Sequence, residues 1–288
     1  MTTPSPTAGF PSPGPSPDAG DLVVTRDEGI ATLWLNRPAK RNAVTYQMWL
    51  DLASHCHTLA ADPAVRLVVV RGVGGHFCAG ADIAGMASVD AGDYRRANED
   101  ADEAIAAVPV PTVAVITGSC IGGGTEIAVA CDLRLADATA RFGITPSRLG
   151  ILYPAPAIER VVRLIGASAA KYLLYSADHI SAERALRIGL VDELHPPDDL
   201  AARVDELTDL LARRRSLLTQ MASKEMVDLA AREGTVAGEV VDRWARNAAA
   251  SDDAAEGIRA FVSKRPPSFT WSPSPDPDPG TGTGTGTG

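Results

Sequence analysis

A run of three glycines followed by a glutamate is the part of the sequence whose residue types are best suited to chemistry. Gly122, Gly123 and Gly124 follow an apolar, β-branched run at residues 112–117, which predicts a strand that ends at a turn and leads into a helix. Glycines let the backbone come close to a ligand. The first amides of a helix point their N–H groups outward, with the positive end of the helix dipole behind them. The pattern predicts an anion or oxyanion site.

Glu126, two positions beyond the glycines, is the candidate for acid–base chemistry. It lies in a segment otherwise made of small and apolar residues, where an unpaired carboxylate would be costly. A glutamate in a first helical turn can also serve only to complement the helix dipole, so the residue alone leaves both interpretations open. The glycines match neither a dinucleotide fingerprint nor a phosphate loop, because the spacing G-x-G-x-x-G and a following Gly-Lys-Ser/Thr are both absent.

A second turn of small residues changes the balance between these interpretations. Residues 65–71 predict another buried strand, and residues 72–82, G-V-G-G-H-F-C-A-G-A-D, follow it as a turn. Two such strands side by side would bring two exposed backbone N–H groups to one point. That arrangement is what an oxyanion hole for a thioester enolate requires.

The segment H-F-C-A-G-A-D-I, followed later by the G-G-G-x-E turn, resembles the enoyl-CoA hydratase/isomerase superfamily, also called the crotonase superfamily. The resemblance covers residues 22–269. It implies an α/β fold, a crotonase-like spiral of ββα units with a C-terminal helical oligomerisation region. It also implies that the N–H groups of Ala81 and Gly123 hold the thioester oxygen, and that Glu126 activates a water or accepts a proton of the acyl group.

The resemblance also implies where coenzyme A binds. In the family, the junction after the first hairpin lies against the adenine and phosphates, and an acidic chain that binds a polyanion needs a local basic cluster there. The residues implied in binding coenzyme A are Arg37, Lys40, Arg41, Ala79, Asp82 and Lys264. Asp82 is expected to act mainly as a cap for the turn after it, and Lys264 to reach coenzyme A bound to a neighbouring subunit.

Ser147 is the position at which the sequence departs from the hydratases. They typically have a glutamate directly after the proline of the motif at residues 140–150, whereas this chain has Ser147 after Pro146. The neighbouring Arg148 cannot replace it, because a guanidinium is not readily deprotonated.

Three interpretations remain open for a site with one carboxyl group. The first is a hydratase or hydratase-like lyase with Glu126 as the sole general acid and base. In such a site Glu126 does both jobs, or a water held by Ser147 delivers the second proton. The second is another enolate reaction on an acyl-CoA, such as double-bond isomerisation, decarboxylation or C–C hydrolysis. The third is a protein that binds CoA esters without chemistry.

Composition and charge restrict the possible partners. The chain carries a formal net charge of −9, which argues against nucleic acid. Residues 1–20 lack the basic and apolar regions of a signal peptide, and no apolar run reaches the length of a membrane span. We therefore expect a cytoplasmic protein without membrane attachment. Its expected partners are an acyl-CoA thioester substrate and, from the resemblance, further copies of the chain in a homotrimer or hexamer.

No metal site and no bound cofactor are predicted, and coenzyme A enters only as part of the thioester substrate. His55 and His57 flank a cysteine, but positions two apart on a helix do not share a face. The cysteines form no C-x-x-C pair and are expected to be buried and reduced. They are Cys56, Cys78, Cys120 and Cys131.

The rest of the chain must hold these turns in place. Residues 22–35 predict a hairpin and residues 45–59 a helix. The resemblance implies that the acyl pocket lies near residues 85–92, whose small residues suit a mobile lid, and Met86 there either lines the pocket or fills space in the core. Helices are predicted at 157–165, 168–176 and 181–188, followed by three or four amphipathic helices up to residue 261. We divide the chain into a disordered tail (1–20), a spiral core (21–197), a helical oligomerisation region (198–265) and a second disordered tail (266–288).

Overall fold

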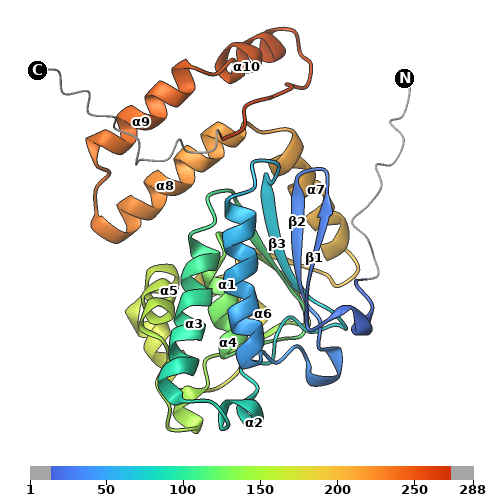
Figure 1. Cartoon of the computed structure of the whole chain (residues 1–288), viewed down its shortest axis with the longest axis vertical. Helices are drawn as coiled ribbons and strands as arrows, with labels where there is room; N and C mark the ends of the chain where they lie inside the picture. Colours follow the sequence, from blue (N-terminus) through green and yellow to red (C-terminus); the bar gives the residue numbers. More distant parts are fainter. Residues whose placement is uncertain (1–13, 274–288) are drawn as a thin grey trace, which may run out of the picture.

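The computed structural model describes residues 14–273, in which a mixed sheet is covered by helices on both faces (Figure 1). The sheet has the strand order β1-β2-β3-β4-β6-β9. Its strands are β1 (Leu22–Asp27), β2 (Ile30–Leu35), β3 (Leu67–Gly72), β4 (Thr112–Ile116), β6 (Leu133–Asp137) and β9 (Glu193–His195). The predicted hairpin is β1 paired antiparallel with β2, and the other pairs are parallel. Because parallel strands are covered on both faces, β2 and β4 consist entirely of buried residues.

A second, smaller sheet continues the same pattern. It contains β5 (Ser119–Ile121), β7 (Arg141–Gly143) and β8 (Ile180–Ser181), in the order β5-β7-β8. Strands β4 and β5 lead into α4 (Gly123–Ala130), and strands β6 and β7 lead into α5 (Ala155–Ser176). In each unit the first strand joins the large sheet and the second joins the small one. This repetition confirms the predicted α/β spiral of ββα units.

Helices on the two faces of the large sheet form two separate cores. On one face, α1 (Tyr46–Ala60) and α3 (Ala91–Ala106) pack against each other, and α7 (Leu200–Arg213) covers the other face. Alternate residues of β3 divide between the two: Val68 and Val70 face the α1–α3 side, while Val69 packs with Val204 of α7. The remaining helices are α2 (Ile83–Met86), α6 (Ala182–Ile188), α8 (Leu217–Glu233), α9 (Gly238–Ala249) and α10 (Asp253–Val262).

Helix boundaries follow the capping residues in the sequence. Thr45 is the N-cap of α1, where its Oγ1 accepts a hydrogen bond from the Met48 amide at 3.1 Å. Gly189 ends α6 in the left-handed region with φ 84°. The two helices predicted between residues 157 and 176 form one element, α5, which is broken at Gly166 (φ 74°).

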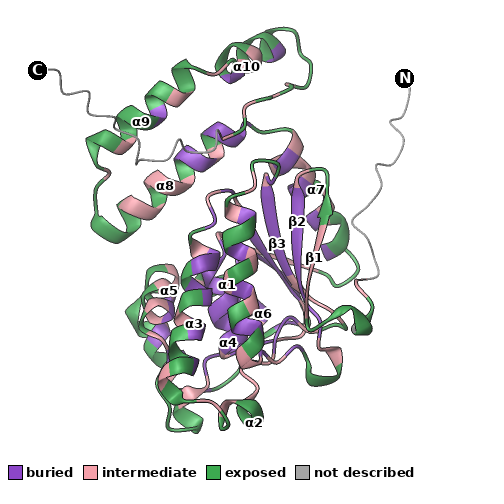
Figure 2. Ribbon diagram, in the orientation of Figure 1, coloured by how far each residue is buried: buried purple, intermediate pink, exposed green. Residues whose placement is uncertain are grey.

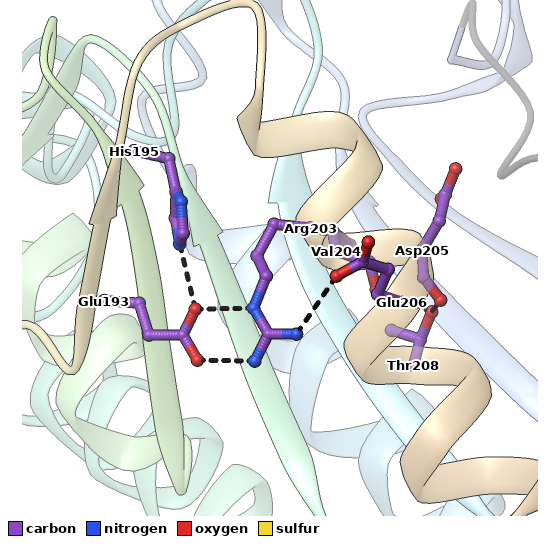
Figure 3. A network of polar contacts seen from close by, with 7 residues as sticks. All are labelled: Glu193, His195, Arg203, Val204, Asp205, Glu206 and Thr208. Carbon is purple, nitrogen blue, oxygen red and sulfur yellow. Dashed lines mark hydrogen bonds and ion pairs between the residues drawn. The ribbon is translucent and has the colours of Figure 1, made fainter.

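Helix α7 is fixed to the edge of the sheet by an ion-pair network (Figure 3). Arg203 donates from Nε and Nη2 to the two carboxylate oxygens of Glu193 on β9, at 2.8 and 2.9 Å. The ring of His195 lies 2.9 Å from the same carboxylate. Arg203 holds the pKa of Glu193 down at about 2. The network thus joins α7 to the edge strand β9.

The C-terminal helices α8, α9 and α10 extend away from the sheet (Figure 1). They lie in the region that was predicted to be helical. Most of their surface is exposed (Figure 2), and in α9 only Trp244 is buried. Phe261 and Val262 on α10 are 85% and 75% exposed although both side chains are apolar. The role of this region in assembling copies of the chain remains a prediction.

Both ends of the described chain pack further than the predicted boundaries at residues 21 and 265. Asn36 donates from Nδ2 to the carbonyls of Ser16 and Gly20, at 2.9 and 2.8 Å. At the other end, the ring of Trp271 lies against Trp244, with 6.4 Å between centroids. Proline-rich composition predicted tails in both places because it does not reveal such anchoring contacts. The rest of the two predicted tails, residues 1–13 and 274–288, lies outside the described residues.

The four cysteines are buried and free, which confirms the prediction. Burial raises the pKa of the Cys56, Cys78 and Cys131 thiols to about 12, so they are protonated at neutral pH. Within residues 14–273, no group of three or more His, Cys, Asp or Glu side chains is arranged to hold a metal ion. No helix in that range is both long enough and apolar enough to cross a membrane.

We predict that Asn42→Ala destabilises the fold by about 2–4 kcal/mol. The fully buried Asn42 side chain donates to the carbonyls of Val73 (2.9 Å) and His76 (2.6 Å) and accepts from the Arg37 amide (2.9 Å), so its removal leaves three partly buried backbone groups without these partners. Urea unfolding measures the change. The control is Arg41→Ala, because Arg41 also has a positive φ but is exposed. Equal stability of the two variants would contradict the assignment.

Candidate active site

The two glycine-rich turns meet because β3 and β4 are parallel neighbours. The loop after β3 and the strand β5 after β4 are joined directly by a bridge between Cys78 and Cys120. In this bridge the Cys78 amide donates to the carbonyl of Ser119 at 2.8 Å, and the Ile121 amide donates to the carbonyl of Cys78 at 3.0 Å. A methyl group added to Gly123 would lie 3.5 Å from the backbone nitrogen of Ala81. The amides of Ala81 and Gly123 are therefore brought to one place.

Both amides are left free by the pairing of their neighbours. The Val44 amide donates to the carbonyl of Gly80, and the Asp82 amide donates to the carbonyl of Val44, both at 2.8 Å. Ala81 lies between these two residues, so its own N–H points away from Val44. Gly123 is the first residue of α4, where a helix has no internal acceptor for its N–H. Neither amide donates a hydrogen bond within the described residues.

Glycine is required at two positions of this arrangement. Gly80 has φ 105°, and a side chain there would come within 2.9 Å of the carbonyl oxygen of Ile121. Gly122 has φ 54° and precedes the first turn of α4. The buried Tyr153 donates from Oη to the Gly122 carbonyl at 3.0 Å, which fixes the start of the helix.

Glu126 lies in the first turn of α4, directly after these amides, and is only 2% exposed. Its Oε1 accepts a hydrogen bond from Nδ2 of Asn98 on α3 at 2.7 Å. Burial raises the pKa of the Glu126 carboxyl well above its ordinary value, and the nearby Asp102 carboxyl raises it further, while the Asn98 hydrogen bond acts against both. A carboxyl group with such a pKa suits general acid–base catalysis near neutral pH.

Several polar residues around Glu126 were missed by the sequence reasoning. Tyr94, Asn98 and Asp102 follow one another at intervals of four on the buried face of α3. Trp49 on α1 donates from Nε1 to Oη of Tyr94 at 2.9 Å, and Arg160 on α5 binds Asp102. The i, i+4 spacing of polar residues in an otherwise small-residue stripe is the signal that could have revealed them.

Ser147, the position that distinguishes this sequence, is exposed on the short turn Pro146–Arg148. Arg148 faces Asp178, 3.8 Å from its carboxylate, and both side chains are more than half exposed. Leu152, in the same loop, is 95% exposed. The loop thus presents no carboxyl group in place of the glutamate that hydratases have there.

The residues predicted to bind coenzyme A have different environments. Arg37 donates to Asp82 at 3.0 Å and to the carbonyl of Ala43 at 2.5 Å, and it lies 3.3 Å from Asp21, so its charge is already matched within the chain. Asp82 also caps α2, where its Oδ1 accepts from the Gly85 amide at 3.5 Å, as the capping interpretation predicted.

The other predicted residues of this group are distributed between two ends of the molecule. Lys40 and Arg41 are exposed, and the carbonyl of Arg41 accepts from the amide of Ala79 at 2.9 Å, which places this basic pair beside the loop that carries Ala81. Lys264 follows α10, which lies at the opposite end of the molecule from α2 (Figure 1). Lys264 therefore does not join the site of its own chain.

Comparison with known proteins identifies the class of protein. The sequence model of the enoyl-CoA hydratase/isomerase family matches residues 25–272, so the chain belongs to that family of enzymes, which act on CoA thioesters. It is 32% identical over 260 residues to a crotonyl-CoA hydratase of Syntrophomonas wolfei, covering 86% of this chain and 97% of the relative. It is also 32% identical over 251 residues to a 2,3-dehydroadipyl-CoA hydratase of Escherichia coli, covering 86% and 98%.

Solved structures agree with this assignment. A putative enoyl-CoA hydratase/isomerase family protein from Hyphomonas neptunium superimposes with a TM-score of 0.82 at 30% identity, covering 89% of this chain and all of the other. An enoyl-CoA hydratase from Bacillus anthracis gives a TM-score of 0.79 at 28% identity, covering 87% and 99%. The predicted superfamily and fold are confirmed.

We predict that Gly123→Ala lowers turnover of CoA thioesters by about 10²–10³. The added methyl group would lie between the Ala81 nitrogen (3.5 Å) and the Trp49 ring (3.0 Å), in the space that an oxyanion needs. The control is Gly238→Ala, because Gly238 is also the first residue of a helix and no atom lies near its added methyl group. Steady-state kinetics compare the two; unchanged turnover in Gly123→Ala would move the oxyanion site elsewhere.

Proposed function

We propose that the protein catalyses the addition of water to, or its elimination from, an acyl-CoA thioester, with Glu126 as the sole general acid and base. The observation that supports this most directly is the pair of free amides at Ala81 and Gly123, with Glu126 in the helical turn directly after them. The amides would bind the thioester oxygen and stabilise the enolate that forms on it. Each such donor is worth about 10²–10³ in rate.

The proposed steps balance with one carboxyl group. In hydration, the oxygen of a water forms a bond to the β carbon, and the electron pair of the double bond moves to the enolate held by the two amides. Glu126 gives a proton to the α carbon, and the thioester carbonyl re-forms. The proton that the water loses returns to Glu126, so the enzyme is regenerated. Elimination runs through the same steps in reverse.

The thioester would be held by its coenzyme A end as well. Lys40 and Arg41 are exposed beside the Ala79–Asp82 loop, so they are the groups available for the adenine and phosphates. Arg37 would contribute indirectly, because its ion pair with Asp82 holds the loop. We further propose that the protein works in the cytoplasm as a trimer or hexamer, in which Lys264 reaches the coenzyme A of a neighbouring subunit.

Ser147 favours one alternative, in which the native reaction is another enolate reaction of this family. Isomerisation, decarboxylation and C–C hydrolysis of an acyl-CoA all use the oxyanion pair. An exposed serine in place of a second glutamate leaves one acid to move every proton. Decarboxylation needs only one proton, delivered to the α carbon, and in an isomerisation one acid can remove a proton from one carbon and return it to another.

We predict that Glu126→Gln lowers turnover by about 10²–10⁴ while CoA-ester binding and folding are retained. Glutamine preserves the shape and can still accept from Asn98, but it cannot transfer a proton. The matched control is Glu159→Gln, which removes an exposed carboxylate of α5 that pairs with Arg163. Turnover is measured on crotonyl-CoA and on β-keto, malonyl and 3-enoyl thioesters, with binding followed by calorimetry. Full turnover in Glu126→Gln would make Glu126 structural.

We predict that Ser147→Glu separates the two candidate reactions. If hydration is limited by the missing second acid, the new carboxyl group restores a donor, and crotonyl-CoA hydration rises by up to about 10²–10⁴. If the native reaction uses the space or the neutral group at this position, that reaction falls and hydration does not rise. Both activities are assayed in the wild type and in Ser147→Glu. If crotonyl-CoA hydration falls in Ser147→Glu, that result is sufficient to count against the hydratase assignment.

A further inference from the structure

The buried face of α3 carries a row of three polar side chains, and the middle one binds Glu126. Tyr94, Asn98 and Asp102 lie one turn apart and are 6%, 7% and 0% exposed. Each binds a different helix: Tyr94 accepts from Trp49 of α1, Asn98 donates to Glu126 of α4, and Asp102 accepts from Arg160 of α5. Buried polar groups are costly unless paired, and each of these three side chains has a partner, although Oδ1 of Asp102 has none within the described residues.

The buried carboxyl groups outnumber the buried cations here. Glu126 and Asp102 both lie in the core, and the only guanidinium of α5 that binds either of them is Arg160, whose side chain is 11% exposed. Arg160 also donates to Glu103 at 2.8 Å, but Glu103 is 57% exposed and is solvated. Two carboxylates facing one buried guanidinium would leave a net negative charge in the core. A proton on one of the two removes it.

Contact geometry decides which carboxyl group keeps the proton. Asp102 touches Arg160 directly, whereas the partner of Glu126 is the neutral amide of Asn98. The negative charge is therefore best placed on Asp102 and the proton on Glu126. Burial raises the pKa of both, with that of Asp102 at about 7 and that of Glu126 well above its ordinary value. The other titratable groups facing Glu126 from the surrounding elements are Glu99, Tyr94, Cys78 and Tyr153.

The hydrogen bond from Asn98 also decides where on Glu126 the proton lies. Oε1 accepts from Nδ2 of Asn98, so it is the carbonyl oxygen of the protonated acid. Oε2 makes no hydrogen bond within the described residues, and it keeps a small accessible surface although the residue is buried. It is therefore the oxygen that reaches the surface of the site, and it carries the proton.

We propose that resting Glu126 is a carboxylic acid whose proton on Oε2 faces the substrate, and that Asn98 and the buried Asp102–Arg160 pair are positioning residues that keep it so. This inference deepens the proposed function and rests on it for the use of the proton. In the reaction the Oε2–H bond breaks, its electron pair stays on the carboxylate, and the enolate pair forms the new C–H bond at the α carbon. The proton returns from the water that adds to the β carbon.

The test measures the titration of Glu126 itself, by carbon-13 NMR of protein labelled at glutamate Cδ. The signal is assigned by its absence in Glu126→Gln. We expect the wild-type midpoint well above 4.5. Asp102→Asn should lower it by about one pH unit or more, because the variant removes a negative charge and frees the guanidinium of Arg160 for Glu126. Asn98→Leu should raise it, because the donor to the carboxylate is lost.

Glu103→Gln is the matched control. It removes a carboxylate from the same guanidinium but on the exposed side, so the Glu126 midpoint should stay where it is. A residue with only a structural role would not shift the midpoint in opposite directions in Asp102→Asn and Asn98→Leu. A wild-type midpoint near 4.5, or shifts in the same direction, overturns the inference. If Asp102→Asn does not fold, a midpoint in Asn98→Leu that is unchanged or lowered still overturns it.

The same samples separate this inference from the proposed function. The pH profile of turnover is recorded beside the NMR titration. Glu126 titrating as expected without turnover on any thioester would leave the inference standing and overturn the proposed function. If turnover depends on Glu126 but the Glu126 carboxyl titrates near its ordinary pKa, the proposed function stands and the inference is overturned.

Discussion

A carboxyl group enclosed in an apolar helix is the constraint on which the rest of the site depends. Glu126 is 2% exposed, and the other residues of α4 are small, apolar or glycine. A carboxyl group in such a place needs a hydrogen-bond donor, a proton, or both. Asn98 supplies the donor from α3, which ties the position of that helix to the chemistry. The packing of α3 against α4 and α5 is thus part of the site as well as part of the core.

The opposite side of the site consists of two backbone N–H groups, those of Ala81 and Gly123, that have no acceptor within the described residues. An N–H group without an acceptor is unusual in a folded protein, and two of them at one place is a strong indication of a ligand. The pairing of Val44 with the residues on either side of Ala81, together with the start of a helix at Gly123, produces them. The bridge between Cys78 and Cys120 then holds both turns in a fixed relation. Such preorganised donors are worth most where water is excluded.

Charge in this protein is arranged at two levels. Exposed ion pairs such as Arg148 with Asp178 contribute little to the stability of the fold, because solvent screens their attraction. The pairs that matter lie deeper: Arg37 with Asp82 holds the loop beside Ala81, and Arg160 with Asp102 lies behind Glu126. In both cases an arginine does not contact the site directly but binds an aspartate that lies next to it. An overall negative charge therefore says little about the local electrostatic field around Glu126 and the amides of Ala81 and Gly123.

The family and the fold class were predicted correctly from the sequence, and Glu126 was singled out there as the candidate for acid–base chemistry. Glycine turns after buried strands and one acid in an apolar helix are local patterns, and local patterns are visible in sequence because propensity and periodicity act over a few residues. The predicted hairpin, the helix capped by Thr45 and the strand before the glycines are all present in the structure. Ser147 was likewise visible as a departure within a known motif.

The surroundings of Glu126 could not be predicted from the sequence. Asn98 and Asp102 precede Glu126 by 28 and 24 positions, and Arg160 comes from a later helix. Nothing in a short window relates them, because their contacts arise from three helices packing together. The same is true of Arg37, whose guanidinium looks available for phosphate in the sequence but is bound by Asp82 in the fold. Pairing between side chains is a property of packing, and packing brings together residues that the sequence keeps apart.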